Sequence, residues 1–232
     1  MMKAAQENGA QGQMLLGRLY ERLGDLDKAQ AAYNAAKAAA TGPMRADVLA
    51  ALADFTLRKG TGKEALAAAN EALAAAPSAK ALAAQARALV RNEDGPGALA
   101  AADKAVAAGA TLSVTHEARG EALIALGRFA DAEQSLKKAV ELDPKSALAY
   151  SRLSRAQFSQ QGRATDAVAS GKKATELDDK LGEGFAMLGL ATLAENPKSW
   201  SDAIAHAQQG AFLDPTNPLV NKAVGKIFEA SG

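Results

Sequence analysis

A short helical pattern recurs along the whole chain, and this repetition restricts the possible folds more than any other feature of the sequence. One alanine opens an apolar stripe in each copy, and successive copies lie 33 to 36 residues apart. These alanines are Ala29, Ala65, Ala98, Ala132, Ala167 and Ala203. A fixed period of this length indicates an architecture in which each repeat buries its apolar side against the next repeat.

Each copy contains two runs with helical spacing, separated by a turn. In the first copy, Ala29, Tyr33 and Ala36 are four and three residues apart, so they share one side of a helix. Gly24 separates this run from the preceding one, and glycine suits the left-handed turn that ends a helix. Alanine is abundant and aromatic residues make up only 4% of the chain, which also favours helix. The sequence therefore predicts antiparallel helix pairs and an all-α fold.

This pattern resembles the tetratricopeptide repeat (TPR) over nearly the whole chain. The resemblance rests on a Leu-Gly or Leu-Ala pair, an aromatic residue, a turn glycine, spaced alanines and a closing proline. Leu16-Gly17 and Tyr20 begin it in the first copy, and Leu188-Gly189 and Asp214-Pro215 mark it in the sixth. The third copy is the weakest because it has no closing proline. The resemblance implies a right-handed α-solenoid of about six TPR helix-turn-helix repeats plus a C-terminal helix, and the repeats resemble bacterial ones in style.

We expect a single TPR array over residues 1–232. The repeats are expected near residues 10–43, 46–78, 79–112, 113–146, 147–181 and 182–217, followed by a terminal helix at 218–231. The helix pairs within them are expected at 10–23/26–40, 45–59/62–75, 79–91/96–108, 113–126/129–142, 147–161/164–177 and 182–195/199–213.

The terminal helix repeats the first-helix pattern of a seventh copy and leaves two interpretations open. It is either a cap, which should have a polar outer face, or the edge of a longer array from which this chain is a fragment. Val220, Val224, Ile227 and Phe228 favour the second interpretation, because one neighbouring repeat would not cover them all. The same apolar surface would allow self-association through the terminal helix.

Charge and composition exclude several classes of function. There are 27 basic and 26 acidic residues, a net charge of +1, so no strong field attracts nucleic acid or an anionic membrane. The absence of cysteine excludes disulfides, thiol catalysis and thiolate zinc sites. No apolar run is long enough to enter a membrane, and the segment from Met1 to Met14 lacks the character of a secretory leader. The compartment stays open between bacterial cytoplasm and periplasm.

The sequence also lacks the groupings that catalysis requires. His116 and His206 belong to different repeats, so no shared metal site is expected. No phosphate-binding loop, dinucleotide fingerprint or nucleophile elbow occurs in a suitable context. We therefore expect no enzyme activity, no cofactor and no metal.

The resemblance implies that the first helix of each repeat lines a concave face that binds a partner protein or peptide. Carried over position by position, the expected partner-binding residues are Arg18, Arg22, Asp54, Arg58, Arg87, Arg91, Glu117, Glu121, Arg155 and Phe158. Arginines of this set would pair with carboxylates of the partner. Met14/Arg18 and Ala50/Asp54 stand where members that clamp chaperone tails carry lysine and asparagine, which argues against that specialised activity.

An apolar set on the same helices has two interpretations. Aliphatic or aromatic residues recur at one equivalent position of five first helices: Leu57, Val90, Ile124, Phe158 and Leu193. They either pack between neighbouring first helices, as recurring apolar residues at helical spacing usually do, or form an apolar stripe for a partner.

The leading hypothesis is a protein-protein interaction scaffold that binds on its concave face and is a fragment of a larger bacterial protein. Two alternatives remain. One is a self-assembling structural module, and the other is the regulatory TPR arm of an enzyme encoded elsewhere in the full-length chain.

Overall fold

The computed structural model describes residues 9–59 and 61–230. This part of the chain contains thirteen α-helices and no strand. The helices are α2 (Gly9–Arg22), α3 (Leu26–Ala39), α4 (Gly42–Lys59), α5 (Gly62–Ala75), α6 (Ala79–Arg91), α7 (Gly95–Ala108), α8 (Ser113–Ala125), α9 (Phe129–Leu142), α10 (Ala147–Phe158), α11 (Ala164–Leu177), α12 (Gly182–Glu195), α13 (Trp200–Leu213) and α14 (Pro218–Ala230). The predicted fold class, an all-α fold built of helix-turn-helix repeats, is confirmed.

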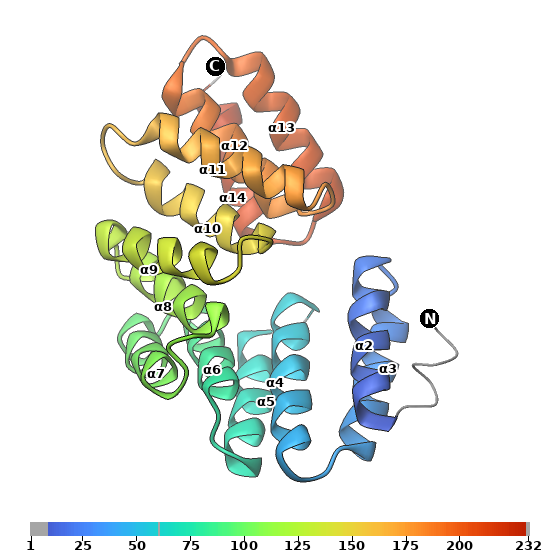
Figure 1. Ribbon diagram of the computed structural model, residues 1–232. Coiled ribbons are helices and arrows are strands. Elements are labelled where there is room, and N and C mark those ends of the chain that lie inside the picture. The colour runs from blue at the N-terminus through green and yellow to red at the C-terminus, as the bar shows by residue number, and fades with distance from the viewer. Residues whose placement is uncertain (1–8, 60, 231–232) are drawn as a thin grey trace. The chain divides into compact units, whose positions relative to one another are not determined.

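The helices pair as antiparallel hairpins, and the hairpins form two compact units. Residues 1–110 make up the N-terminal unit and residues 111–232 the C-terminal unit. In the N-terminal unit, α2/α3, α4/α5 and α6/α7 are packed pairs, and they can be followed in chain order in Figure 1. In the C-terminal unit, the pairs are α8/α9, α10/α11 and α12/α13, and α14 packs on the last pair. The expected continuity of all repeats into a single array stays a prediction.

Most helices begin and end within two residues of the positions expected from sequence, but α10 is shorter than expected. It ends at Phe158 rather than near residue 161. The hydroxyl of Ser159 donates to the Arg155 carbonyl, and the amide of Gln160 donates to the Ala156 carbonyl. These two side chains satisfy carbonyls that a further helical turn would have used, so the helix can stop there.

Small residues bring the two helices of a pair into close contact. All six alanines that define the period are fully buried. The crossing of α12 and α13 is made by Gly182 and Gly210. A Cβ atom added to Gly210 would lie 2.9 Å from the Gly182 carbonyl oxygen, and one added to Gly182 would lie 2.8 Å from the Gly210 carbonyl oxygen. The sequence pattern is therefore a packing pattern, in which the recurring small residues are the points of helix contact.

Several turns between paired helices contain a left-handed residue, as the glycine pattern predicted. Gly24 and Gly127 have φ angles of +76° and +72°. Gly60, expected to do the same, lies outside the described residues. The third copy has no glycine here, and Glu93 takes the left-handed conformation instead, with φ of +63°. Since a side chain is unfavourable in this region, Glu93 is a local site of strain.

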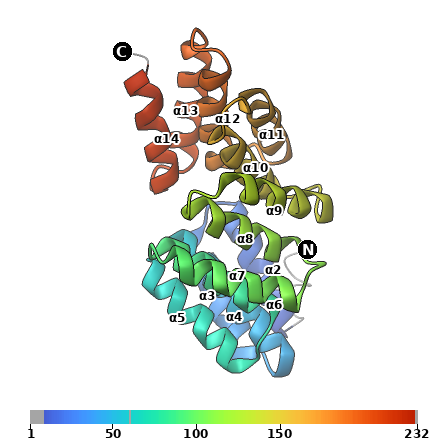
Figure 2. The same ribbon diagram turned by 90° about the vertical axis from the view of Figure 1, so that its left-hand side faces the viewer.

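Helix α14 packs on α12 and α13 (Figure 2). Val220, Ala223 and Ile227 are buried in this contact. The opposite side of the helix carries exposed Lys222 together with Phe228, which is 44% exposed. Both polar and apolar groups therefore face outward on α14. No helix of the described residues is long and apolar enough to cross a membrane.

Candidate protein-binding faces

The first helices of successive hairpins present charged side chains at equivalent positions. We call the side chains of α2, α4 and α6 at these positions the N-terminal face: Arg18, Glu21, Arg22, Asp47, Asp54, Arg58, Lys80, Arg87 and Arg91. The corresponding C-terminal face lies on α8, α10 and α12: Glu117, Glu121, Ser151, Arg152, Arg155, Phe158 and Glu183. Each face is formed because α2 packs on α4 and α4 on α6, and likewise α8 on α10 and α10 on α12.

On the N-terminal face, ion pairs join each hairpin to the next. Nη2 of Arg87 donates to both carboxylate oxygens of Asp54, at 2.6 and 2.7 Å. Nζ of Lys80 lies 3.1 Å from a carboxylate oxygen of Asp47. Because Arg87 is buried, its pair with Asp54 satisfies a charge that would otherwise be costly to remove from water. Two of the predicted partner-binding residues, Asp54 and Arg87, thus contact each other.

A third contact between hairpins involves Arg58, which is also one of the predicted partner-binding residues. Its Nε donates to Oε1 of Glu21 at 3.0 Å, and the hydroxyl of Tyr33 donates to Oε2 of the same carboxylate at 2.7 Å. Tyr33 is fully buried. Burial raises the pKa of the Tyr33 phenol, and the Glu21 carboxylate raises this pKa further, so Tyr33 stays a hydrogen-bond donor. Glu21 is therefore fixed by the core and in turn orients the exposed Arg58.

The other three arginines of the predicted site on this face make no such contact. Arg18 and Arg22 on α2 and Arg91 on α6 are exposed, and no ion pair joins them to any residue within 9–59 or 61–230. Each of the three carboxylates of the N-terminal face forms an ion pair with a lysine or arginine of the next hairpin. This face therefore keeps an excess of positive charge.

The C-terminal face is organised differently, around one buried arginine. Nη1 of Arg152 lies 3.1 Å from Oε2 of Glu117, and its Nη2 lies 3.1 Å from Oε1 of Glu121. The hydroxyls of Ser113 and Ser146 also donate to Glu117, at 3.0 and 3.2 Å. Glu117 and Glu121, both predicted to contact a partner, are thereby tied to α10.

A further carboxylate, Glu183, is buried beside this cluster. Burial raises the pKa of Glu183; Arg152 and Arg155 act to lower it, and Glu121 acts to raise it. No described side chain donates a hydrogen bond to Glu183. The C-terminal face thus holds three carboxyl groups and two guanidinium groups, so it lacks the excess of positive charge found on the N-terminal face.

The recurring apolar residues contribute mainly to packing. Ile124 is buried, and Phe158 packs against the clusters around Val168 and Met187. Leu193 packs against the same cluster as Met187. Phe158 keeps some exposure, so it is both part of the core and accessible at its edge. Phe158 is therefore compatible with both interpretations, packing between helices and contact with a partner. Ile124 contributes mainly to packing.

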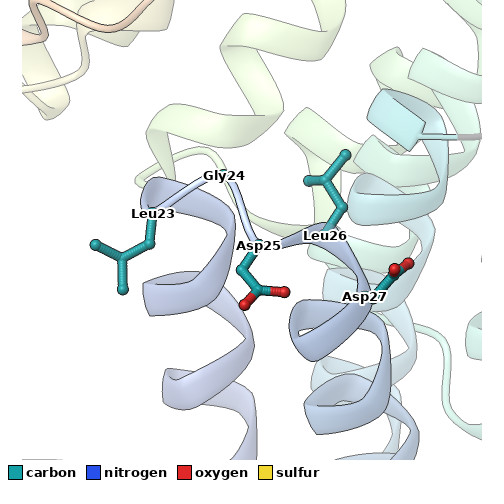
Figure 3. A pocket seen from close by; sticks show the side chains of 5 residues that line it. All are labelled: Leu23, Gly24, Asp25, Leu26 and Asp27. Atoms are coloured by element: carbon teal, nitrogen blue, oxygen red, sulfur yellow. The ribbon is translucent and has the colours of Figure 1, made fainter.

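Outside the two faces, described residues also line a shallow hollow. The hollow lies at the turn between α2 and α3 and is lined by Leu23, Gly24, Asp25, Leu26 and Asp27 (Figure 3). The two leucines point apart, and Asp25 is occupied in capping α3 through the Lys28 amide. Within the described ranges, no three His, Asp or Glu side chains are placed to hold a metal ion.

The hairpins, their small contact residues and their paired first helices define a helical repeat protein, and comparisons identify its family. A model of the tetratricopeptide repeat matches residues 14–80 and 117–181. The chain therefore belongs to the tetratricopeptide repeat family, whose members are generally non-catalytic modules for protein–protein interaction.

Solved structures show the same fold in other proteins. A chain in the crystal structure of the APC/C hetero-tetramer Cut9–Hcn1 is similar with a TM-score of 0.68 and 13% identity. The match covers 94% of the present chain and 42% of that chain, so the present chain spans less than half its length. TTC0263, a thermophilic TPR protein of Thermus thermophilus, matches with a TM-score of 0.58 and 18% identity, over 95% of the present chain and 99% of its own. A comparison with curated proteins finds no match.

Sequence reasoning missed Arg152, which organises the C-terminal face. A signal for it was present: the equivalent positions of the other first helices are Leu15, Ala51, Ala84, Ala118 and Met187, all uncharged. A single charged residue at a position that is otherwise small or apolar indicates a specific buried partner. The partner-binding role of the ten predicted residues stays a prediction.

Proposed function

We propose that this chain is an interaction scaffold that binds a partner protein through its first-helix faces. The observation that supports this most directly is on the N-terminal face. Its ion pairs between hairpins stabilise the array, yet Arg18, Arg22 and Arg91 remain exposed and contribute to none of them. Exposed charges that the fold does not use are typical of a recognition surface. A similar fold within the Cut9–Hcn1 assembly supports the same class of function.

Site-specific photo-crosslinking tests this proposal. A benzophenone amino acid is placed on a first helix, at Arg18 or Ala125, or on a second helix, at Lys104 or Gln134; all four positions are exposed. In extract of the source organism, the first-helix positions should crosslink to a partner and the second-helix positions should not. Crosslinks from the second helices alone, or from none of the four positions, would contradict the proposal.

A second candidate function is self-association near the C-terminus. Phe212 on α13 is 81% exposed and Phe228 on α14 is 44% exposed, which is unusual for large apolar side chains. If these residues join copies of the chain, sedimentation velocity should show an oligomeric fraction that increases with protein concentration. The variant Phe212→Ser/Phe228→Ser should lose this oligomer. A chain that stays monomeric over the whole concentration range excludes this function.

A further inference from the structure

Three arginines occupy the same position in the three first helices of the N-terminal unit. Each arginine lies five positions after the small residue of the Leu-Gly, Leu-Ala or equivalent pair in its helix. The small residues are Gly17, Ala53 and Ala86, and the arginines are Arg22, Arg58 and Arg91. All three are exposed; the side chain of Arg58 is 56% accessible even though Glu21 contacts it. We call these residues the arginine row. It crosses α2, α4 and α6, which lie side by side (Figure 1).

The fold itself does not require arginine at this position. In the C-terminal unit the equivalent residues are Ala125, Ser159 and Ala194, which are small and uncharged. Arg22 and Arg91 have no ion-pair partner among the residues that the structure describes. The arginine row is therefore a property of the N-terminal unit alone. The charges of Arg22 and Arg91 are available to a ligand, and Arg58 donates to Glu21 through Nε and Nη2 only, so Nη1 of its exposed side chain is available as a further donor.

Carboxylates are the ligand groups that suit this row best. A guanidinium group binds a carboxylate through two parallel hydrogen bonds, and Arg58 already does so in part with Glu21. Nucleic acid is disfavoured because the chain's net charge of +1 provides no long-range attraction for a phosphate backbone. The charge pattern favours a protein segment that carries a few separated carboxylates.

The spacing of the helices limits the conformation of such a segment. Packed helices lie about 9 Å apart, so we expect successive arginines of the row to be separated by a similar distance. A polyproline II segment rises about 3.1 Å per residue with three residues per turn, so every third side chain points the same way at intervals of about 9 Å. An acidic residue at every third position would meet one arginine after another.

We propose that the arginine row binds an extended acidic segment of the partner protein, with Asp or Glu at every third residue. This inference rests on the proposed scaffold function and specifies the chemistry of the partner at one face. It names residues that act together, Arg22, Arg58 and Arg91, in place of the dispersed set predicted from sequence.

Peptide binding to the full chain tests the proposal. Two fluorescent peptides of about twelve residues have the same composition of Glu, Pro and Ala, with glutamates at every third position in one and in a single block in the other. The variant Arg22→Ala/Arg91→Ala removes two charges of the row. The matched control Lys63→Ala/Lys104→Ala removes two exposed charges from second helices of the same unit. Circular dichroism verifies that both variants are folded.

The spaced peptide should bind more tightly than the block peptide. The row variant should lose roughly tenfold or more in affinity, since each lost contact is a charge-assisted hydrogen bond, and the lysine variant should be nearly unchanged. Binding should weaken when the ionic strength rises from about 0.01 M to about 0.15 M, which shortens the screening length to about 8 Å.

Three results would overturn the inference: equal binding of both peptides, equal loss in both variants, or tighter binding of a single-stranded RNA of similar length. The photo-crosslinked partner separates this inference from the proposed function. If that partner crosslinks to the first helices and still binds the row variant at full affinity, the acidic-segment inference is wrong and the scaffold function stands. If no first-helix position crosslinks, the scaffold function itself is wrong.

Discussion

At the scale of single residues, glycines that allow backbone to contact backbone decide how closely two helices pack. Gly182 and Gly210 allow the backbones of α12 and α13 to meet, and a methyl group at either position would press on a carbonyl oxygen. Backbone cannot move aside as a flexible side chain can. A glycine in a helix is normally a disadvantage relative to alanine, so at this crossing the packing outweighs the helix propensity.

Two glycine substitutions should therefore have opposite effects. Gly210→Ala should destabilise the chain by about 1–3 kcal/mol, because the added methyl overpacks the crossing. Gly225→Ala on α14 should stabilise it by about 0.5–1 kcal/mol, because nothing lies within 4 Å of the added atom and alanine favours the helix. Urea denaturation of both variants measures the difference. A gain in stability for both would show that α12 and α13 do not pack this closely.

The buried carboxylate of Glu183 should make stability depend on pH. Burial raises its pKa in the folded state above the ordinary value of 4.5. Between these two pKa values the folded chain binds a proton that the unfolded chain has released, so stability falls as pH rises through this window. Its contribution is fully present below about pH 4.5 and lost above the folded-state pKa.

Glu183→Gln removes this dependence while keeping the shape of the side chain. The variant should unfold at a higher temperature than the natural chain at pH 7, and the difference should shrink as the pH falls towards 4. Thermal melts across this pH range measure the effect. A Gln variant that is less stable at pH 7 would mean that Arg152 and Arg155 keep Glu183 favourably ionised.

At the scale of elements, caps and contacts between helices determine where each helix lies. Helix α5 begins at a capping box, in which the Thr61 side chain accepts from the Glu64 amide and the Glu64 side chain accepts from the Thr61 amide. Such caps are local and readable from the sequence. Helix α14 depends instead on its contact with α12, where the Cδ1 atom of Ile227 lies over Gly189.

The attachment of α14 should depend on Ile227 far more than on its neighbour Phe228. Ile227→Ala should cost about 2–4 kcal/mol, because a fully buried side chain is truncated, and should speed amide exchange mainly in α14. Phe228→Ala serves as the matched control and should change stability by less than about 1 kcal/mol, since Phe228 is partly exposed. Equal effects of both substitutions would show that α14 packs through a different side.

At the scale of the whole molecule, each unit has a hydrophobic core of its own. In the N-terminal unit, Tyr33 and Phe55 pack with ring centroids 5.2 Å apart. In the C-terminal unit, Leu136 is fully buried above Gly120. Repeat proteins are stabilised mainly by contacts between neighbouring repeats, so a defect in one core should spread only a short distance along the chain.

Hydrogen exchange should reveal this division. Phe55→Ala should cost about 3–5 kcal/mol and reduce amide protection chiefly between residues 9 and 110. Leu136→Ala should cost about 2–5 kcal/mol and reduce protection chiefly beyond residue 111. If either substitution lowered protection evenly along the chain, the two units would form one cooperative structure.

The sequence determined the repeat, the family and most helix boundaries. Helical spacing, turn glycines such as Gly24 and contact alanines such as Ala29 act through residues close in the chain, so they can be recognised without knowing the fold. It also placed the charged residues on first helices, because that placement follows from the repeat period alone.

Only the tertiary structure decided which of these charges are free. The pairing of Asp54 with Arg87 joins residues 33 apart, and the position of Arg152 between two glutamates depends on how α8 and α10 pack. Side-chain conformation and helix register over such separations are not encoded in local spacing. The sequence therefore predicted a charged first-helix face, and the fold selected Arg22 and Arg91 as charges that no neighbouring hairpin uses.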